Sequence, residues 1–278
     1  MPIVATLWSL TVLAAISVSL AFTGNISYRL AQNSLHVAYD DALADAAVNR
    51  AVLALLDPRT DSRRLMNAAD QKFDFGGASI RIRIQDELGK IDLNQTDGST
   101  LVKLFQSAGI DPAAAEALVD KVLDWRESSP FKRVNGAKAD EYRAAGYDYL
   151  PRNGPFQSVD ELTLVMGMTR DLYKRVEPAL TVYSGRQFVD PQFATPEVLA
   201  ALPSLANAHA AAAGLLTEST TVAPISGISG NPINVLKGRA FTIDTEISRS
   251  IEVTHHHSAV RLTGNPADPF WMLMRQRT

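Results

Sequence analysis

The chain has 278 residues, of which 46% are hydrophobic, and a formal net charge of −3. This length is enough for a membrane anchor and one or two globular units. The charge is too small to indicate nucleic acid or an anionic surface as the main partner. The absence of cysteine excludes a disulfide framework and thiolate chemistry.

The N-terminal segment is the most apolar part of the chain. Residues 2–28 contain no charged side chain, and the first charge is Arg29. About 20 apolar residues in a helix span the ~30 Å hydrocarbon core of a bilayer. Apolar residues then return at helical spacing among charged ones until Pro58, where proline ends the pattern. We therefore expect one helix that spans a membrane over residues 1–28 and is amphipathic over residues 29–57.

A cleavable secretory signal is the alternative interpretation of this segment. Such signals combine a basic n-region, a short apolar core and a cleavage site of small residues. Ala21 resembles a cleavage site, but no basic residue precedes it. The helical pattern also continues past Ala21, which favours a retained helix.

The periodicity of the sequence changes after this helix. Residues 59–72 form a polar link, and residues 78–85 alternate apolar and polar side chains, as a half-buried strand does. After a turn, Ile91 and Leu93 are expected in the returning strand of a hairpin. Residues 58–96 therefore predict the first strands of a sheet.

A long helical block follows at residues 97–216. Within it, residues 162–176 predict two short helices joined at Gly167, an arrangement that resembles a helix-hairpin-helix unit. A short strand is expected about Leu180. The alanine-rich residues 196–216 predict a further helix, which we interpret as a degenerate second copy of the hairpin.

The C-terminal part, residues 217–278, begins with a link rich in Ser, Gly, Pro and Thr. Alternating apolar residues at 241–253, 260–262 and 270–274 then predict three strands in an antiparallel meander. The simplest fold for this order of elements is α+β. The long N-terminal helix packs on one antiparallel sheet, and the all-helical block is a large insertion.

Several motifs, taken in order, resemble the K-type minor pseudopilins of the type II secretion system, the GspK family. Each motif is short, but the ordered series runs over most of the chain. The motifs are Leu7-Trp8 in the apolar helix, Gly89-Lys90-Ile91-Asp92-Leu93-Asn94, Leu123-Asp124-Trp125-Arg126, Pro151-Arg152-Asn153 with the residues up to Met168, Leu180-Thr181-Val182-Tyr183-Ser184, and Val260-Arg261-Leu262-Thr263-Gly264.

The resemblance implies a pilin-like fold and a non-enzymatic role at the tip of a short filament, the pseudopilus. There the subunit would help to initiate and cap the filament for protein export across the outer membrane. The implied partners are the I- and J-type minor pseudopilins, the major pseudopilin and the inner-membrane assembly platform. The implied location is the inner membrane, spanned once, with the soluble domain in the periplasm.

The resemblance also implies processing at the N-terminus. The family is made with a short basic leader, which a prepilin peptidase removes before it methylates the new N-terminus. Alignment on Trp8 places Met1 at the first mature position. The leader and its cleavage glycine are not in this sequence, so Met1 is either the processed residue of the mature form or the product of a mis-assigned start.

The resemblance gives the first turns of the helix a role in filament assembly, through Ala5, Leu7, Trp8, Leu10 and Leu13. Most pilin-like subunits have a glutamate at the fifth position, and a carboxylate inside a membrane needs a partner such as a neighbour's terminal amine. A subunit with nothing above it has no amine to neutralise, so Ala5 fits a tip subunit. The simpler interpretation is that Ala5 is an ordinary apolar helix residue.

An acidic segment follows the helix that contains Trp125. Members of the family bind calcium in an acidic loop at this place, and calcium takes about six to eight oxygen ligands. The resemblance therefore implies calcium as a cofactor, bound by Asp124, Glu127, Asp140 and Glu141. A solvated acidic loop is the alternative interpretation.

Other chemistry has weak support in the sequence. His255 and His257 share one face of a predicted strand, but no third metal ligand at a fitting spacing accompanies them, so an exposed strand is the favoured interpretation. The chain lacks Gly-x-Ser-x-Gly, His-Glu-x-x-His and phosphate-loop motifs. We therefore expect no enzymatic activity.

The rival function is a membrane-anchored helix-hairpin-helix DNA-binding protein of the competence type. In such hairpins backbone amides hold a phosphate, and Arg170, Lys174 and Arg175 would supply charge. The hairpin has Gly167 without a second glycine two residues away, so the backbone would approach phosphate less easily. Together with the acidic net charge, this favours an assembly subunit without a nucleic-acid partner.

Overall fold

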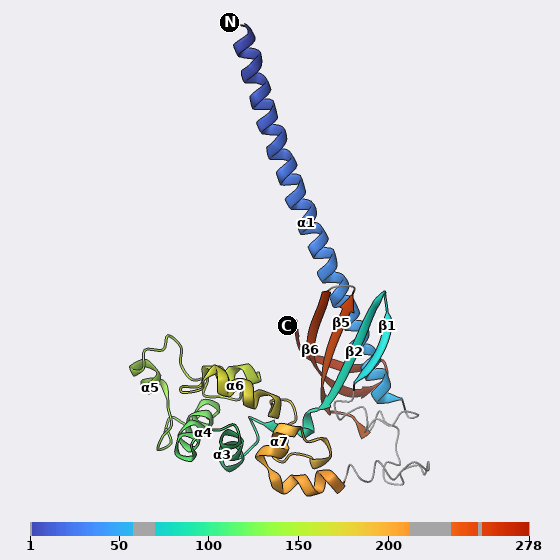
Figure 1. The fold of residues 1–278 in the computed structure, drawn as a ribbon. Coiled ribbons are helices and arrows are strands. Elements are labelled where there is room, and N and C mark those ends of the chain that lie inside the picture. The colour runs from blue at the N-terminus through green and yellow to red at the C-terminus, as the bar shows by residue number, and fades with distance from the viewer. Residues whose placement is uncertain (1, 58–69, 212–234, 250–251, 278) are drawn as a thin grey trace.

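The structure is a computed structural model that describes residues 2–57, 70–211, 235–249 and 252–277. A long helix projects from a twisted sheet, and a group of short helices lies beyond the opposite end of that sheet (Figure 1). The elements in chain order are α1 (Pro2–Leu56), β1 (Gln71–Phe75), β2 (Ala78–Asp86), η1 (Glu87–Gly89), β3 (Ile91–Asp92), α3 (Gly98–Ser107), α4 (Pro112–Arg126), α5 (Ala139–Ala144), η2 (Val159–Leu164), α6 (Arg170–Val176), η3 (Glu177–Ala179), β4 (Leu180–Thr181), η4 (Pro191–Phe193), α7 (Pro196–Ala201), η5 (Pro203–Leu205), β5 (Ala240–Arg249), β6 (Glu252–Asn265) and β7 (Asp268–Arg277), where η marks a 3₁₀ turn.

The larger sheet is antiparallel and has the strand order β1-β2-β5-β6-β7. β1 and β2 form a hairpin through Gly76 and Gly77, whose φ angles of 57° and 69° suit a two-residue turn. β2 pairs with β5, so the strands before and after the helical block lie side by side. The C-terminal meander of β5, β6 and β7 confirms the prediction from the alternating residues.

The second half of α1 packs on one face of this sheet. The alternation in β2 is the expected one, because Ile80, Ile82 and Ile84 are buried while Arg81 and Arg83 face away from the helix. Small and branched residues on one side of α1 let the helix approach the sheet closely. These residues are Leu43, Ala44, Ala47, Val48, Ala51, Val52 and Leu55.

The helical block has a hydrophobic core of its own. In this core the ring of Trp125 stacks on Phe156 at 6.2 Å between ring centroids, and Tyr142 lies 6.0 Å from Trp125. The expected α+β fold with an inserted block is therefore present. The block is not entirely helical, because β4 pairs in parallel with β3 at its base.

The predicted return strand at Ile91 and Leu93 is wrong. The turn η1 directs the chain away from the sheet, so β3 pairs with β4 and not with β2. Ile91 and Leu93 consequently lie in the core of the inserted block. The block therefore begins earlier than the expected boundary at residue 97.

Two further predictions needed correction. The link predicted at residues 59–72 overlaps β1, a strand that the sequence did not reveal, while residues 58–69 lie outside the described residues. The helix predicted at residues 196–216 is interrupted after Ala201, because Pro203 begins the turn η5, and the chain is helical again over residues 206–211. Residues 212–216 lie outside the described residues. In the hairpin, the first predicted helix is the 3₁₀ turn η2, and only α6 is an α-helix.

The sheet and the inserted block meet at a close joint formed by η1 and η4. The backbone N–H of Asp190 donates to the carbonyl of Leu88 at 2.8 Å, and that of Thr195 donates to Gly89 at 3.3 Å. A Cβ on Gly89 would lie 1.8 Å from the carbonyl oxygen of Phe193. The two backbones thus touch at a place where only glycine fits.

Candidate functional site: the free helix and the acidic loop

The first half of α1 has no packing partner among the described residues. The stretch Pro2–Leu20 is 19 residues long with a mean hydropathy of 2.1, and none of it is buried. A continuous apolar surface of this size is covered by lipid or by other helices in a working protein. Met1 lies outside the described residues. All five residues expected to act in assembly are exposed on this free helix: Ala5, Leu7, Trp8, Leu10 and Leu13.

Four hydroxyl groups in the apolar half of this helix are satisfied within the helix. Thr6 and Thr11 donate to the carbonyl three residues earlier, and Ser9 and Ser17 to the carbonyl four residues earlier, all at 2.8–2.9 Å. Each hydroxyl therefore needs no water partner. This arrangement suits a hydrocarbon environment, where unpaired polar groups are costly.

Ion pairs fix the point at which α1 leaves the sheet. The side chain of Asp40 is 3% exposed and lies 3.4 Å from both Arg249 and Arg277, at the ends of β5 and β7. One turn further along, Arg275 of β7 pairs with Asp45 at 2.7 Å. The helix is therefore held to the edge strand by charge as well as by apolar packing.

The acidic loop after α4 is organised around Arg133. Its guanidinium lies 2.9 Å from the buried Asp124 carboxylate and forms two hydrogen bonds with Glu127, at 2.5 and 2.9 Å. The bond from Arg133 lowers the pKa of Glu127, and the same bond raises the pKa of Arg133. The fixed fork of a guanidinium suits such paired contacts. Asp124 and Glu127 are thus brought together by an arginine.

A lysine occupies the other polar centre of this loop. Lys138 is only 9% exposed, and its ammonium group donates to the carbonyl oxygens of Asp124 at 2.6 Å and Glu127 at 2.7 Å. A third bond reaches Oδ1 of Asn153 at 3.1 Å. These carbonyls belong to the C-terminal end of α4, where helix carbonyls lack partners and the helix dipole favours a cation.

The other two candidate calcium ligands have separate partners. Asp140 is exposed and pairs with Arg143 at 2.9 Å, while Glu141 pairs with Lys132 at 2.8 Å. Among the described residues, no three acidic, histidine or cysteine side chains are grouped so that they could hold a metal ion. As they stand, the four acids do not fit a calcium ion, because each carboxylate is already paired with a basic side chain. The calcium binding that the resemblance implies is untested.

The hairpin of the rival DNA-binding hypothesis is also well defined. Gly167 adopts a positive φ of 90°, and the Thr169 hydroxyl caps α6 by accepting from the N–H of Leu172 at 3.2 Å. Arg170 and Lys174 are exposed on this helix. The capping hydroxyl already takes one of the amides that a phosphate would need. Nucleic-acid binding by this unit stays untested.

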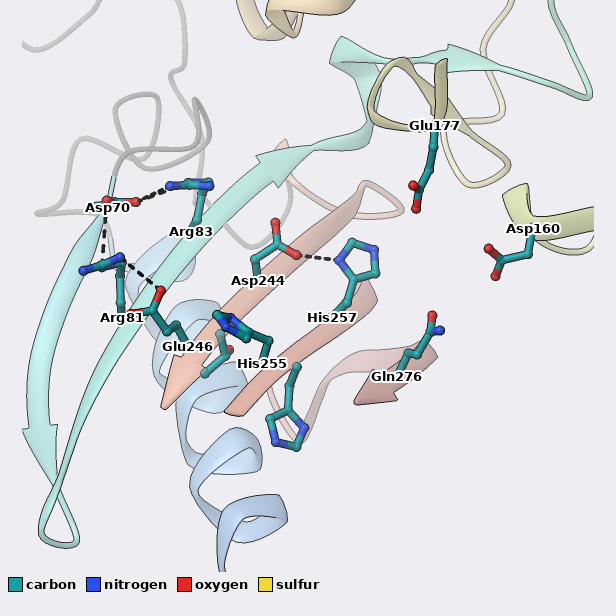
Figure 2. Close-up of a pocket in the computed structure, with 12 residues that line it drawn as sticks. Asp70, Arg81, Arg83, Asp160, Glu177, Asp244, Glu246, His255, His257 and Gln276 are labelled. Carbon is teal, nitrogen blue, oxygen red and sulfur yellow. Dashed lines mark hydrogen bonds and ion pairs between the residues drawn. The ribbon is translucent and has the colours of Figure 1, made fainter. Parts of the chain in front are cut away.

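A polar groove lies between the outer face of the sheet and the inserted block, with a volume of about 460 Å³. Figure 2 shows Asp244 and His257 on the sheet side and Asp160 and Glu177 on the side of the block. His257 bonds Asp244 at 2.5 Å. Burial raises the pKa of Glu177.

The three consecutive histidines divide between the two faces of β6, as the strand period predicts. His255 is exposed and His257 is half-buried on the groove side, whereas His256 is buried on the face that carries α1. Among the described residues, neither face of β6 brings together three side chains that could hold a metal ion.

Arg133 and Lys138, which form the centre of the acidic loop, were not predicted from the sequence. The available signal was the presence of basic residues among the acids of residues 124–141. Their partners could not be predicted, because the bonds span six to fifteen residues of mostly irregular chain.

Comparison with known proteins gives a family match over residues 85–185, to the family described as type II secretion system (T2SS), protein K. The type II secretion system protein K of Klebsiella pneumoniae is 36% identical over 76 residues, which cover 27% of this chain and 23% of the relative. That of Pectobacterium carotovorum subsp. carotovorum is 29% identical over 122 residues, which cover 38% and 37% of the two chains. The chain thus matches well under half the length of these curated relatives.

The fold also matches a solved structure. A chain in the crystal structure of the GspK-GspI-GspJ complex from the type 2 secretion system of enterotoxigenic Escherichia coli aligns with a TM-score of 0.63 and 16% identity. The alignment covers 89% of this chain and 99% of that chain. At this identity the likeness shows a shared fold.

Proposed function

Because this chain is a relative of protein K of the type II secretion system, we propose that it is a minor pseudopilin at the tip of the pseudopilus. In this role it helps to initiate and cap the filament for protein export across the outer membrane. The observation that carries the proposal is the unburied apolar stretch Pro2–Leu20, which projects from one end of the sheet while the inserted block lies beyond the other (Figure 1).

The free helix suits two environments in succession. Before assembly, its apolar half spans the inner membrane once and holds the soluble domain in the periplasm. On incorporation the helix leaves the bilayer and packs beside equivalent helices in the filament core, where its exposed apolar side chains are again covered. Ala5 supports a terminal position, because this subunit has no carboxylate that would need the terminal amine of a subunit above it.

The position of the inserted block supports the capping role. It extends the subunit at the end of the sheet opposite the free helix (Figure 1). A subunit that stacked on this end would meet the block, so the filament would grow in one direction only. Among the partners of this subunit we include I- and J-type minor pseudopilins, since the related chain occurs in a complex with GspI and GspJ. The major pseudopilin, the assembly platform and a prepilin peptidase that processes and methylates the N-terminus complete the set.

The membrane half of the helix can be tested with Leu13→Arg. Charge at a helix centre costs about 2.5–3.5 kcal/mol on insertion scales, and in the filament it would leave a cation among apolar helices. We expect Leu13→Arg to abolish pseudopilus assembly and secretion, as measured by export of a type II substrate in cells, while Leu13→Ile retains both. Normal secretion by Leu13→Arg at normal protein levels would contradict the proposal.

Partner binding provides the second test. We expect the full chain in detergent to co-purify with the I- and J-type subunits of the same system as a ternary complex. The rival DNA-binding function predicts instead an affinity for duplex DNA that falls steeply with salt. A chain that binds DNA in this manner and forms no complex with the two subunits would favour the rival.

A further inference from the structure

The acidic loop between α4 and α5 contains two cationic side chains. They contact oxygens that a bound metal ion would otherwise contact. The ammonium of Lys138 has three oxygen acceptors within 3.1 Å, two of which are main-chain carbonyls at the end of α4. Main-chain carbonyls, carboxylates and amide oxygens are also the ligands that calcium prefers. The loop thus offers oxygens for a cation, and the chain itself supplies that cation.

Arg133 completes the arrangement on the carboxylate side. It binds both Asp124 and Glu127 through its guanidinium, and its backbone N–H also donates to Asp124 at 3.1 Å. The backbone at Gly136 lies close to the same carboxylate, since a Cβ on Gly136 would lie 1.8 Å from Oδ2 of Asp124. The buried carboxylate is therefore paired and enclosed without a metal ion.

We propose that Lys138 and Arg133 act as built-in cations that hold the loop of residues 127–138 closed, so that its conformation in this chain does not depend on calcium. A tethered ammonium or guanidinium cannot be lost to a chelator or diluted, whereas a bound ion leaves as its free concentration falls. Calcium would also have to displace both cations to reach the oxygens.

The closed loop has a consequence for the surface of the inserted block. Phe131 and Val134 flank Arg133 in this loop and are 82% and 93% exposed. Because Arg133 is anchored to Asp124 and Glu127, these two apolar side chains are held outward at a fixed place. The built-in cations therefore keep this apolar surface formed whether or not calcium is present in the surrounding compartment.

Limited digestion of the full chain in detergent tests the proposal locally. Chymotrypsin cleaves after exposed phenylalanines, and Phe188, which is 80% exposed in another loop, serves as an internal reference. We expect the ratio of cleavage at Phe131 to cleavage at Phe188, measured by mass spectrometry, to be the same in millimolar calcium chloride and in EGTA. Lys138→Met and Arg133→Gln should each raise this ratio several-fold in both conditions.

Arg143→Gln is the matched control, because within the described ranges Arg143 pairs only with the exposed Asp140, in a contact that does not close the loop. It should leave the ratio unchanged. Calorimetric titration of the unmodified chain with calcium chloride should give no binding heat. The proposal is overturned if EGTA raises cleavage at Phe131 in the unmodified chain, if calcium binds there with measurable heat, or if neither Lys138→Met nor Arg133→Gln changes the ratio. The two measurements on the unmodified chain decide the question even where a variant does not fold.

Discussion

His256 is a buried histidine on the face of the sheet that packs against α1. It is 2% exposed, and neither ring nitrogen has a hydrogen-bond partner among the described residues. The charged groups around it are Asp40 and Asp41 on α1 and Arg275 and Arg277 on β7. Burial lowers the pKa of the His256 imidazole, and the two arginines lower it further while the two aspartates raise it.

The lowered pKa makes stability depend on pH. The unfolded chain binds a proton near the ordinary histidine value of about 6.5, whereas the folded chain resists protonation. His256 therefore costs no stability above that value and reduces stability as the pH falls below it. We expect the free energy of unfolding, measured with denaturant, to fall less between neutral and mildly acidic pH in His256→Phe than in the unmodified chain.

Two comparisons isolate this effect. The exposed His255 offers the control His255→Gln, which should leave the pH dependence unchanged. Asp86 has the opposite effect on the pH dependence of stability. Burial raises the pKa of its carboxyl group to about 6. The stability gained from its protonation is therefore lost as the pH rises through that value. This contribution is common to all three proteins and cancels in the difference. An identical pH profile in His256→Phe would show that His256 is not a buried neutral group.

At the scale of residues, the sequence predicted where certain side chains lie, but it did not predict which residues they contact. The strand period correctly divided the three histidines between two faces. The sequence also placed Asp124 and Glu127 together in one acidic loop. It could not show that Arg133 and Lys138 reach back to them, because long side chains in an irregular loop leave no periodic signal.

At the scale of elements, the contact between α1 and β7 depends on Asp40. Its carboxylate is nearly buried and lies beside Arg249 and Arg277, which are each about one-quarter to one-third exposed. Removing it would leave both arginines without this acceptor. We expect Asp40→Ala to lower the free energy of unfolding by about 1–3 kcal/mol. Hydrogen exchange should also become faster in the second half of α1.

The neighbouring acid provides the control for Asp40→Ala. Asp45 pairs with Arg275, but its side chain is 51% exposed, and exposed pairs contribute about 0–1 kcal/mol. Asp45→Ala should therefore have a small effect on stability and hydrogen exchange. Equal effects of the two substitutions would mean that burial of Asp40 adds nothing to the contact.

Elements with a strong period were predicted, and elements set by distant partners were not. The long helix and the C-terminal meander carry clear apolar repeats. β1 has only Phe73 and Phe75 as apolar residues, so it resembles a polar link until β2 pairs with it. β3 has two residues, and its parallel partner β4 lies almost ninety residues further along the chain, a separation that local pattern cannot bridge.

At the scale of the whole molecule, the proposed function requires a fixed relation between the sheet and the inserted block. The joint of η1 and η4 supplies it through backbone contacts. A side chain adds to it, since Gln85 donates to the carbonyl of Phe193 at 2.8 Å. The sequence predicted that the block is an insertion, but not this joint, because Gly89 meets Phe193 only in the folded chain.

Gly89→Ala tests whether this joint sets the position of the block. The added Cβ would overlap the carbonyl of Phe193, so one of the two backbones must move. The chain contains no cysteine, and spin labels attached through Ser79→Cys on β2 and Glu116→Cys on α4 therefore report one distance. We expect Gly89→Ala to shift or broaden the distribution of this distance, measured by pulsed electron resonance, while circular dichroism stays unchanged.

The matched control is Gly154→Ala, since Gly154 has space for a methyl group, with its nearest neighbour at 3.7 Å. The label distance should then be unaltered. If Gly89→Ala also keeps the parent distribution, the joint accommodates the methyl group locally and does not orient the block. If the distribution changes, the same variant should weaken pseudopilus assembly in cells, because a displaced block would no longer meet its partners in register with the helix that enters the filament core.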